Sequence, residues 1–477
     1  MITFASIRRL VTSGLIALSA SLTASAQHAA PAQPRNILLI MADDIGIEGF
    51  GCYGGESYAT PHIDQLAKEG IRFSHAYSQP LCTPTRVQIM TGKYNHRNWE
   101  AFGILAQGSR TFGHVMSGFG YDTLISGKWQ LNSYDPPEFP NADRRRNTGM
   151  HPRDAGFDKY MLFHSEHTED KGSRYANPTY LKNDELITEE GTYGEDSSTD
   201  YILEYMEQNR DERMFVYYPM ALPHWPANPT PHSDAWADPA RRLENDQAFF
   251  PDMVEYMDTL IGKLVNGLED LGLRDDTLII FYSDNGTDKK NTSVMSGVEI
   301  PGQKSYPVQA GVRVPLVASW PNGAPKGIVS TDLIDASDFL PTLIELAGHE
   351  APNAWQLDGQ SFAPQLRGET HPAPRESVFV WYDPRPGDDK AHLDRAVFAL
   401  DHNYKLYADG RLMKIDDLLP IETEIAPDDY NAADRTARAK LAGVINDMMQ
   451  PPLSPRVANV VDAYGDPIKW QSRLGAE

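Results

Sequence analysis

Three acidic residues and one amide residue stand directly after stretches of sequence that are typical of buried strands. Asp43 and Asp44 follow an apolar run at residues 36–41, and Asp284 and Asn285 follow a second β-rich run. Carboxylate and amide oxygens are the ligands that Ca²⁺ and Mg²⁺ prefer, whereas zinc prefers histidine or thiolate. Either pair alone could instead cap a following helix or turn. Because the two pairs follow equivalent strand ends, the pattern predicts a site for a hard cation such as calcium or magnesium.

A lysine and a histidine occupy similar positions. Lys128 follows a strand-like run at residues 121–126, and His224 comes shortly after another at residues 214–220. In an open parallel sheet, ligands bind outside the carboxyl ends of the strands. An isolated lysine is usually a solvated surface group, and a histidine beside prolines can be structural. The shared placement at strand ends favours a role for both residues in the same site as the acidic residues.

Cys82 begins the run Cys82-Thr83-Pro84-Thr85-Arg86. Proline suits the first turn of a helix, so this run predicts a helix with Cys82 at its N-terminus. Free backbone N–H groups at that end favour an anion. The alternative is a buried or disulfide-bonded cysteine, with Cys52 as the only partner in the chain.

With its Cys-x-Pro-x-Arg signature, the chain resembles the type I, formylglycine-dependent sulfatases of the alkaline-phosphatase-like superfamily. Further segments agree with that family, in the same order, from about residue 36 to about residue 348. Each segment is short, so the resemblance depends on their number and order. They are residues 36–44, Thr91-Gly92-Lys93-Tyr94, Gly127-Lys128-Trp129, Pro223-His224-Trp225-Pro226, Ser283-Asp284-Asn285-Gly286, Lys304 and Gly311-Val312-Arg313-Val314-Pro315.

The resemblance implies a specific chemistry for Cys82. A separate maturation enzyme would oxidise it to formylglycine (3-oxoalanine), and the hydrated aldehyde would attack the sulfur of a sulfate ester and expel the alcohol. Arg86 would hold the hydrated aldehyde, while Lys128 and Lys304 would contact sulfate oxygens. His224 would contact sulfate and protonate the leaving oxygen. The implied calcium ligands are Asp43, Asp44, Asp284, Asn285 and the modified Cys82.

One position departs from the family pattern. The second residue after the lysine of Gly-Lys-Trp is usually a histidine that hydrogen-bonds formylglycine and assists its regeneration, whereas this chain has Gln130. A carboxamide can hydrogen-bond substrate but does not accept a proton near neutral pH. Either another base acts here or turnover is slower than in relatives. The candidate bases are His114, His151, His164 and His167.

The activity implied by the resemblance is that of a sulfuric ester hydrolase (EC 3.1.6 type) acting on a sulfated oligo- or polysaccharide. Two alternatives stay open, namely a phosphoester or phosphonate hydrolase that uses the same modified residue, and a non-catalytic glycan-binding relative indicated only by Gln130. The basic run Arg144-Arg145-Arg146 and the polar stretch at residues 164–180 could bind an anionic carbohydrate. Solvated loops explain each of them equally well.

The elements that position these residues alternate between β-rich runs and helical patterns. For residues 35–370, this predicts an α/β catalytic domain, a large, mixed, mostly parallel sheet sandwiched by helices, of the alkaline-phosphatase-like kind. From about His371 the pattern changes. Residues 371–477 are expected to form a small antiparallel α+β subdomain, with strands near 377–382, 395–400 and 404–408 and a helix near 435–449.

The N-terminus has the composition of a secretory signal peptide. Arg8 and Arg9 precede an apolar stretch at residues 10–22, and Ala24-Ser25-Ala26 fits a cleavage site. The apolar stretch is short for a membrane-spanning helix, so no stable membrane anchor is expected. Residues 1–26 are therefore predicted to be removed and residues 27–34 to form a disordered lead, which implies a periplasmic or secreted protein.

The amino-acid composition excludes several classes of protein. The chain of 477 residues has a net charge of −23, which argues against a nucleic-acid partner because phosphate backbones attract clustered lysine and arginine. Its 2 cysteines are too few for a disulfide scaffold or a cysteine-based zinc cluster.

Overall fold

The computed structural model describes residues 32–133, 145–164, 172–387, 390, 392–450 and 453. The predicted signal peptide and residues 27–31 of the predicted lead lie outside these residues, as do Arg144 and His167. The described residues from Gln33 onward belong to one compact unit. The predicted boundary at residue 370 stays a prediction.

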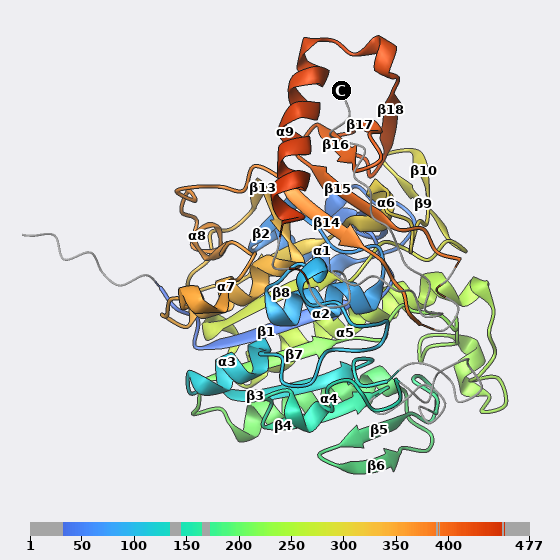
Figure 1. The fold of residues 1–477 in the computed structure, drawn as a ribbon. Helices are drawn as coiled ribbons and strands as arrows, with labels where there is room; N and C mark the ends of the chain where they lie inside the picture. Colours follow the sequence, from blue (N-terminus) through green and yellow to red (C-terminus); the bar gives the residue numbers. More distant parts are fainter. Residues whose placement is uncertain are drawn as a thin grey trace, which may run out of the picture. The chain divides into compact units, whose positions relative to one another are not determined.

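Eighteen strands and nine α-helices occur in the described residues (Figure 1). The strands are β1 (Asn36–Ala42), β2 (Ile71–Tyr77), β3 (Asp122–Lys128), β4 (Lys159–Phe163), β5 (Thr179–Lys182), β6 (Glu185–Thr188), β7 (Met214–Pro219), β8 (Thr277–Ser283), β9 (Thr292–Met295), β10 (Val298–Pro301), β11 (Arg313–Val314), β12 (Leu316–Ser319), β13 (Ile328–Asp335), β14 (Val378–Tyr382), β15 (Ala396–Leu400), β16 (Tyr404–Tyr407), β17 (Leu412–Ile415) and β18 (Glu422–Ile425). The helices are α1 (Pro61–Lys68), α2 (Cys82–Thr91), α3 (Phe112–Gly118), α4 (Gly194–Gln208), α5 (Phe250–Asp270), α6 (Gln309–Val312), α7 (Phe339–Leu346), α8 (Ala363–Leu366) and α9 (Ala432–Met448).

Strand β1 is buried along its whole length because helices cover both faces of the sheet. Successive side chains of a strand point to opposite faces. Ile37, Leu39 and Met41 belong to one hydrophobic cluster, with residues of α2, α3 and α7. Leu38 and Ile40 belong to a second cluster, with residues of α1, α4 and α5. The uninterrupted apolar run predicted such a central strand, and the structure confirms it.

The large sheet is mixed, with a parallel centre formed by β8, β1, β7, β3 and β4. Antiparallel pairs lie outside that centre, since β12 runs against β8 and β2, and β5 runs against β4 and β6. The predicted fold class is thus confirmed. Because β1, β3, β7 and β8 are parallel, their carboxyl ends lie at one edge of the sheet.

The apolar run at residues 314–320 is typical of one strand, but the structure divides it. β11 ends at Val314 and β12 begins at Leu316, with Pro315 between them. Proline has no N–H to donate to a neighbouring strand, which accounts for the interruption.

The C-terminal strands form a five-stranded antiparallel sheet, β14 to β18 in order, and α9 packs on it through Leu441 and Ile445 (orange and red in Figure 1). The helix begins at Ala432, three residues before its predicted start, because Asn431 and Asp434 form a reciprocal capping box at its N-terminus. The same hydrophobic cluster contains Leu81 and Cys82. The C-terminal sheet therefore packs against the segment that carries Cys82.

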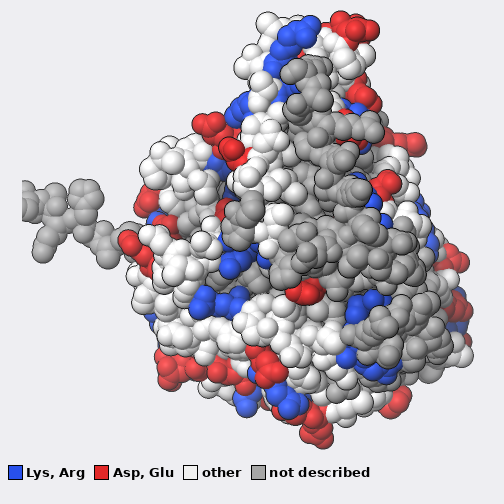
Figure 2. All heavy atoms as spheres, in the orientation of Figure 1, with Lys and Arg blue, Asp and Glu red and all other residues white. Residues whose placement is uncertain are grey.

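On the face shown in Figure 2, lysine and arginine side chains form small separate patches among acidic and uncharged ones. Within the described residues, no helix is both long and apolar enough to cross a membrane.

A substitution at Gly127 would test whether close packing of the β3 and β7 backbones fixes the position of Lys128. Its φ is +129°, and a Cβ atom at this position would lie 2.1 Å from the carbonyl oxygen of Pro219 in β7. Gly127→Ala should force β3 and β7 apart, lower the free energy of unfolding by about 1–3 kcal/mol and displace Lys128. Urea unfolding monitored by circular dichroism measures the change.

Gly118→Ala is the matched control, because a Cβ atom there meets nothing within 4 Å at the end of α3. It should leave stability unchanged or raise it by up to about 1 kcal/mol. Equal unfolding midpoints for the two variants would contradict the packing argument.

Candidate active site

The acidic residues predicted to converge lie together, fully buried, at the carboxyl ends of two adjacent strands. β1 and β8 are parallel neighbours with Ala42 opposite Ser283, so the residues after them come side by side. The backbone N–H of Asp44 donates to Asp284 Oδ1 at 3.2 Å. Asn285 Nδ2 donates to Asp44 Oδ1 at 2.8 Å.

Three basic side chains reach these carboxylates from three different parts of the chain. Lys128, the last residue of β3, places Nζ 2.6 Å from Asp43 Oδ2. Arg86 of α2 places Nη2 2.9 Å from Asp284 Oδ2 and 3.7 Å from Asp43 Oδ2. Lys304, in the segment after β10, pairs with Asp44 Oδ2. We call these six residues the ion cluster.

Burial governs the protonation of the ion cluster. It raises the pKa of Asp284 to about 8, and repulsion from Asp43 adds to this effect. Burial also raises the pKa of Asp44. Burial opposes ionisation of Asp43 too, but Lys128 and Arg86 outweigh it and lower the pKa of that carboxyl to about 2. Asp284 is therefore harder to ionise than Asp43, although Arg86 and Lys128 favour its charged form.

The oxygen atoms of the ion cluster and its neighbour Asn285 fit a divalent cation. Asp43 Oδ1 and Asn285 Oδ1 are buried and have no hydrogen-bond partner among the described residues. Buried acceptors without partners are unfavourable, and a hard cation would satisfy them. One ligand atom from each of Asp43, Asp44 and His224 also lies within 4.8 Å of the others. The predicted metal residues are thus brought together, and His224, which was not predicted as a ligand, joins them.

Cys82 is the first residue of α2, as the sequence predicts, and is 2% exposed. Its Sγ donates to Gln130 Oε1 at 3.4 Å. Burial raises the pKa of the thiol, although Lys128 and Lys304 nearby act in the opposite direction. Both Cys82 and Cys52 are free thiols. The thiol therefore lies beside the ion cluster and is not joined to Cys52.

Gln130 follows β3 with a φ of +54°, and its backbone N–H donates to the carbonyl oxygen of His164 at 3.1 Å. His114 is occupied in the cap of α3, and His151 accepts a hydrogen bond from the backbone of Arg153. Of the candidate bases within the described residues, His164 is thus the one bonded through its backbone to Gln130.

His224 points Nε2 toward the ion cluster, 3.6 Å from Asp44 Oδ2. Its Nδ1 lies 2.8 Å from Arg174 Nη1 and 2.5 Å from the carbonyl oxygen of Trp225. The two contacts require opposite tautomers, because arginine only donates and a carbonyl only accepts. Burial lowers the pKa of His224 well below its usual range, and Lys304 lowers it further. The ring is therefore neutral, and its proton resides on either nitrogen.

Three residues that support His224 were not singled out in the sequence. Arg174 lies within the polar stretch suspected of binding carbohydrate, and it contacts the imidazole directly. Tyr175 Oη donates to the carbonyl oxygens of Ala221 (2.8 Å) and His224 (2.6 Å). Glu195 accepts from the backbone N–H of Ala221 at 2.5 Å. Nothing in the spacing of Tyr175 or Glu195 distinguishes them from ordinary core and helix residues.

Comparisons with known proteins agree with this arrangement. Residues 35–349 match the sulfatase family, and residues 303–430 match the C-terminal region of N-sulphoglucosamine sulphohydrolase. Human arylsulfatase A is 32% identical over 418 residues, which cover 80% of this chain and 77% of that protein.

Solved structures share the fold. BT4656 in complex with its substrate D-glucosamine-2-N,6-O-disulfate has a TM-score of 0.63 and 21% identity, over 88% of this chain and 96% of that one. The phosphonate monoester hydrolase of Agrobacterium radiobacter has a TM-score of 0.63 and 19% identity, over 87% and 95% of the two chains. At these identities, the fold alone is shared.

Calcium should stabilise the protein, and more so at high pH. With calcium at 100 times its dissociation constant, the free energy of unfolding should rise by about 2.7 kcal/mol. Because the raised pKa of Asp284 is about 8, calcium must displace a proton at neutral pH. The increase in melting temperature on adding calcium should therefore be larger at pH 9 than at pH 6. Thermal unfolding with calcium or with a chelator measures it.

In the calcium-free protein, the contribution of Asp284 to stability changes with pH in the opposite direction. A carboxyl whose pKa is raised from 3.8 to about 8 contributes stability that is present below pH 4 and lost as pH rises to about 8. Asp284→Asn should abolish most of the calcium effect. Asp258→Asn removes a buried carboxylate that binds the N-terminus of α1 instead, and should retain the calcium effect. Equal loss in both variants would contradict a site at the ion cluster.

Proposed function

The chain belongs to the sulfatase family of sulfate-ester hydrolases, and we propose that it removes sulfate from a sulfated carbohydrate through a formylglycine made from Cys82. The observation that carries this proposal is the position of Cys82, at the buried N-terminus of α2 beside two lysines and two carboxylates. A hydrated formylglycine would supply the oxygen nucleophile, and a calcium ion held by Asp43, Asp44, Asp284 and Asn285 would neutralise sulfate oxygens.

The basic residues of the ion cluster suit an anionic substrate. Lys128 and Lys304 end beside Asp43 and Asp44, and both side chains are at most 13% exposed. Poorly hydrated ammonium groups interact strongly with an oxyanion. Arg86 is fixed between Asp284 and the carbonyl oxygen of Lys128. Its position on α2, one turn beyond Cys82, suits it to orient the modified residue.

His224 is the proposed proton donor to the leaving oxygen. When Arg174 donates to Nδ1, the neutral ring presents an N–H at Nε2 toward the ion cluster, and the negative charge of a bound sulfate would favour the protonated ring that proton transfer requires. Tyr175 holds the backbone on both sides of Pro223 and so fixes the ring at this edge of the sheet. Arg174 and Tyr175 are therefore proposed as positioning residues.

The carbohydrate substrate is supported by the match of residues 303–430 to the C-terminal region of a sulphoglucosamine sulphohydrolase. A phosphonate hydrolase shares the fold, so relative rates on sulfate and phosphonate esters separate these two activities. The maturation enzyme is a further proposed partner. A periplasmic or secreted location follows from the N-terminal sequence.

Conversion of Cys82 can be tested by mass. After co-expression with a maturation enzyme, the tryptic peptide ending at Arg86 should be about 18 Da lighter than its thiol form. Cys82→Ala should lower the hydrolysis of a small aryl sulfate by at least about 10³-fold. Cys52→Ala is the control, since Cys52 lies in a separate hydrophobic cluster, and it should retain activity. An unmodified thiol, together with activity that survives Cys82→Ala, would refute the proposal.

Gln130 should limit turnover. Histidine accepts the left-handed backbone of this position, so Gln130→His should place a base beside Cys82 and raise kcat on aryl sulfate by at least about tenfold. Gln130→Asn also accepts this backbone but cannot take a proton, so kcat should not rise. If neither variant gains activity, regeneration does not depend on a base at position 130.

A further inference from the structure

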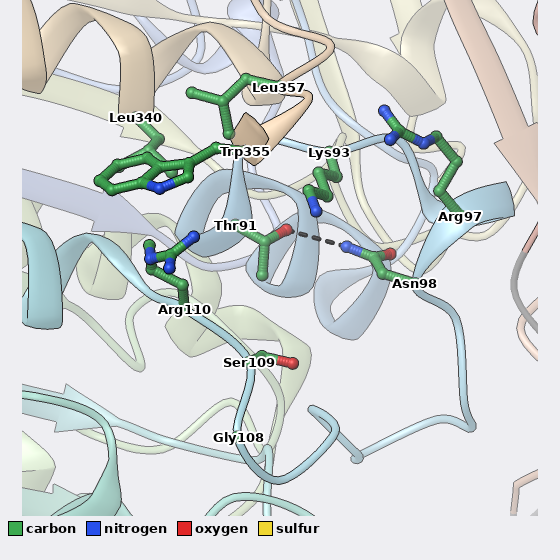
Figure 3. Close-up of a pocket in the computed structure, with 10 residues that line it drawn as sticks. All are labelled: Thr91, Lys93, Arg97, Asn98, Gly108, Ser109, Arg110, Leu340, Trp355 and Leu357. Carbon is green, nitrogen blue, oxygen red and sulfur yellow. Dashed lines mark hydrogen bonds between the residues drawn. The ribbon is translucent and has the colours of Figure 1, made fainter. Parts of the chain in front are cut away.

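A cavity of about 310 Å³ lies at the opposite end of α2 from Cys82 (Figure 3). It is lined by Thr91, Lys93, Arg97, Asn98 and Arg110, and by an apolar side that includes Trp355. Thr91 is the ninth residue after Cys82 in α2, which corresponds to about 14 Å along the helix axis. No residue assigned above to the ion cluster or to the binding of sulfate lines this cavity.

Two of its cations have no acidic partner bonded to them. Arg97 is already used, because it pairs with Asp358 and donates to the carbonyl oxygen of Gln356 at 2.8 Å. In the part of the chain that the structure describes, neither Lys93 nor Arg110 forms a hydrogen bond or ion pair with a carboxylate. Figure 3 shows Lys93 and Arg110 on either side of Thr91. With Asp358 as the acidic neighbour, the cavity has a local excess of positive charge in a chain whose net charge is −23.

Arg110 is held in a way that leaves its donors available. Its guanidinium lies 4.1 Å from the ring centroid of Trp355. Stacking on an aromatic ring fixes the plane of the guanidinium but uses none of its five N–H donors. A planar donor group prepared in this way matches the oxygens of a sulfate or carboxylate group.

The remaining lining suits a sugar ring better than a bare ion. Leu340, Leu357 and Trp355 form an apolar side, and the Thr91 hydroxyl accepts from Asn98 Nδ2 at 2.9 Å on the polar side. A pyranose has both apolar C–H faces and hydroxyl edges. A volume near 310 Å³ lies at the lower end of small-molecule sites, which is adequate for one monosaccharide.

We propose that this cavity binds one sulfated monosaccharide unit, with Lys93 and Arg110 contacting its sulfate group. The inference rests on the proposed function only in its choice of ligand, since a sulfatase of sulfated carbohydrates meets such units at high local concentration. Because the protein as a whole carries a large negative charge, it repels a polyanionic carbohydrate. A local cationic site would attract that carbohydrate to one place on the surface. The site would hold a substrate chain or its product away from Cys82.

Fluorine NMR can locate the binding. Protein with the Cys82→Ala substitution is labelled with 5-fluorotryptophan, and the Trp355 resonance is identified by its loss in Trp355→Phe. Titration with D-glucosamine-2-N,6-O-disulfate should shift that resonance to saturation. Lys93→Gln and Arg110→Gln should each weaken the apparent affinity about tenfold, whereas Lys159→Gln, at an exposed position on β4, should not.

The outcomes separate the two proposals. The shift requires no formylglycine, so it is expected even if Cys82 proves not to be modified, and Lys93→Gln should leave aryl sulfate hydrolysis by the mature enzyme unchanged. No saturable shift, or a shift that Lys93→Gln and Arg110→Gln leave unaltered, would overturn the cavity proposal. An equal response to neutral N-acetylglucosamine would overturn the role of sulfate. An equal response to inorganic sulfate would overturn the role of the sugar.

Discussion

Burying three carboxylates at one edge of a parallel sheet is costly unless positive charge is brought to them. Asp43 and Asp44 leave β1, Asp284 leaves β8, and the parallel pairing of these strands makes their proximity unavoidable. Compensation comes from three elements, namely the helix of Arg86, the end of β3 with Lys128 and the segment of Lys304. The relative positions of these elements are therefore tied to one electrostatic requirement.

The charges of the ion cluster balance, but its hydrogen bonding is incomplete, which indicates what the arrangement is for. Among the described residues, two buried oxygens, Asp43 Oδ1 and Asn285 Oδ1, have no hydrogen-bond partner, and burial raises the pKa of Asp284. A purely structural ion network would gain nothing from unpaired acceptors. A site that receives a divalent cation and an anion would need them, because the free oxygens can bind the cation while the anion interacts with the lysines.

The sequence predicted those features that follow from the parallel sheet. Adjacent strand ends brought Asp43, Asp284, Lys128 and the segment of His224 together as expected, and proline placed Cys82 at a helix start. Lys304 could be named only from the family resemblance, because no rule of spacing predicts where a loop lysine ends. Side-chain contacts between residues that are distant in the sequence could not be predicted for the same reason.

Other elements escaped prediction because their signals are tertiary. Tyr175 supports His224 through a hydroxyl whose partner carbonyls lie 46 and 49 residues away in the chain. Strands such as β5 and β18 are short and partly exposed, so their sequences lack an apolar run.

The burial of Cys82 has a consequence for the order of events in biosynthesis. All ten residues of α2 are buried, and the C-terminal sheet shares a hydrophobic cluster with Cys82. An oxidising enzyme must surround the thiol with its own active site, which the finished fold does not permit. If Cys82 is converted, conversion precedes the docking of β14 to β18, which are synthesised after Cys82. Docking of the C-terminal strands then ends the period in which Cys82 is accessible. A chain that folds before modification can no longer be converted.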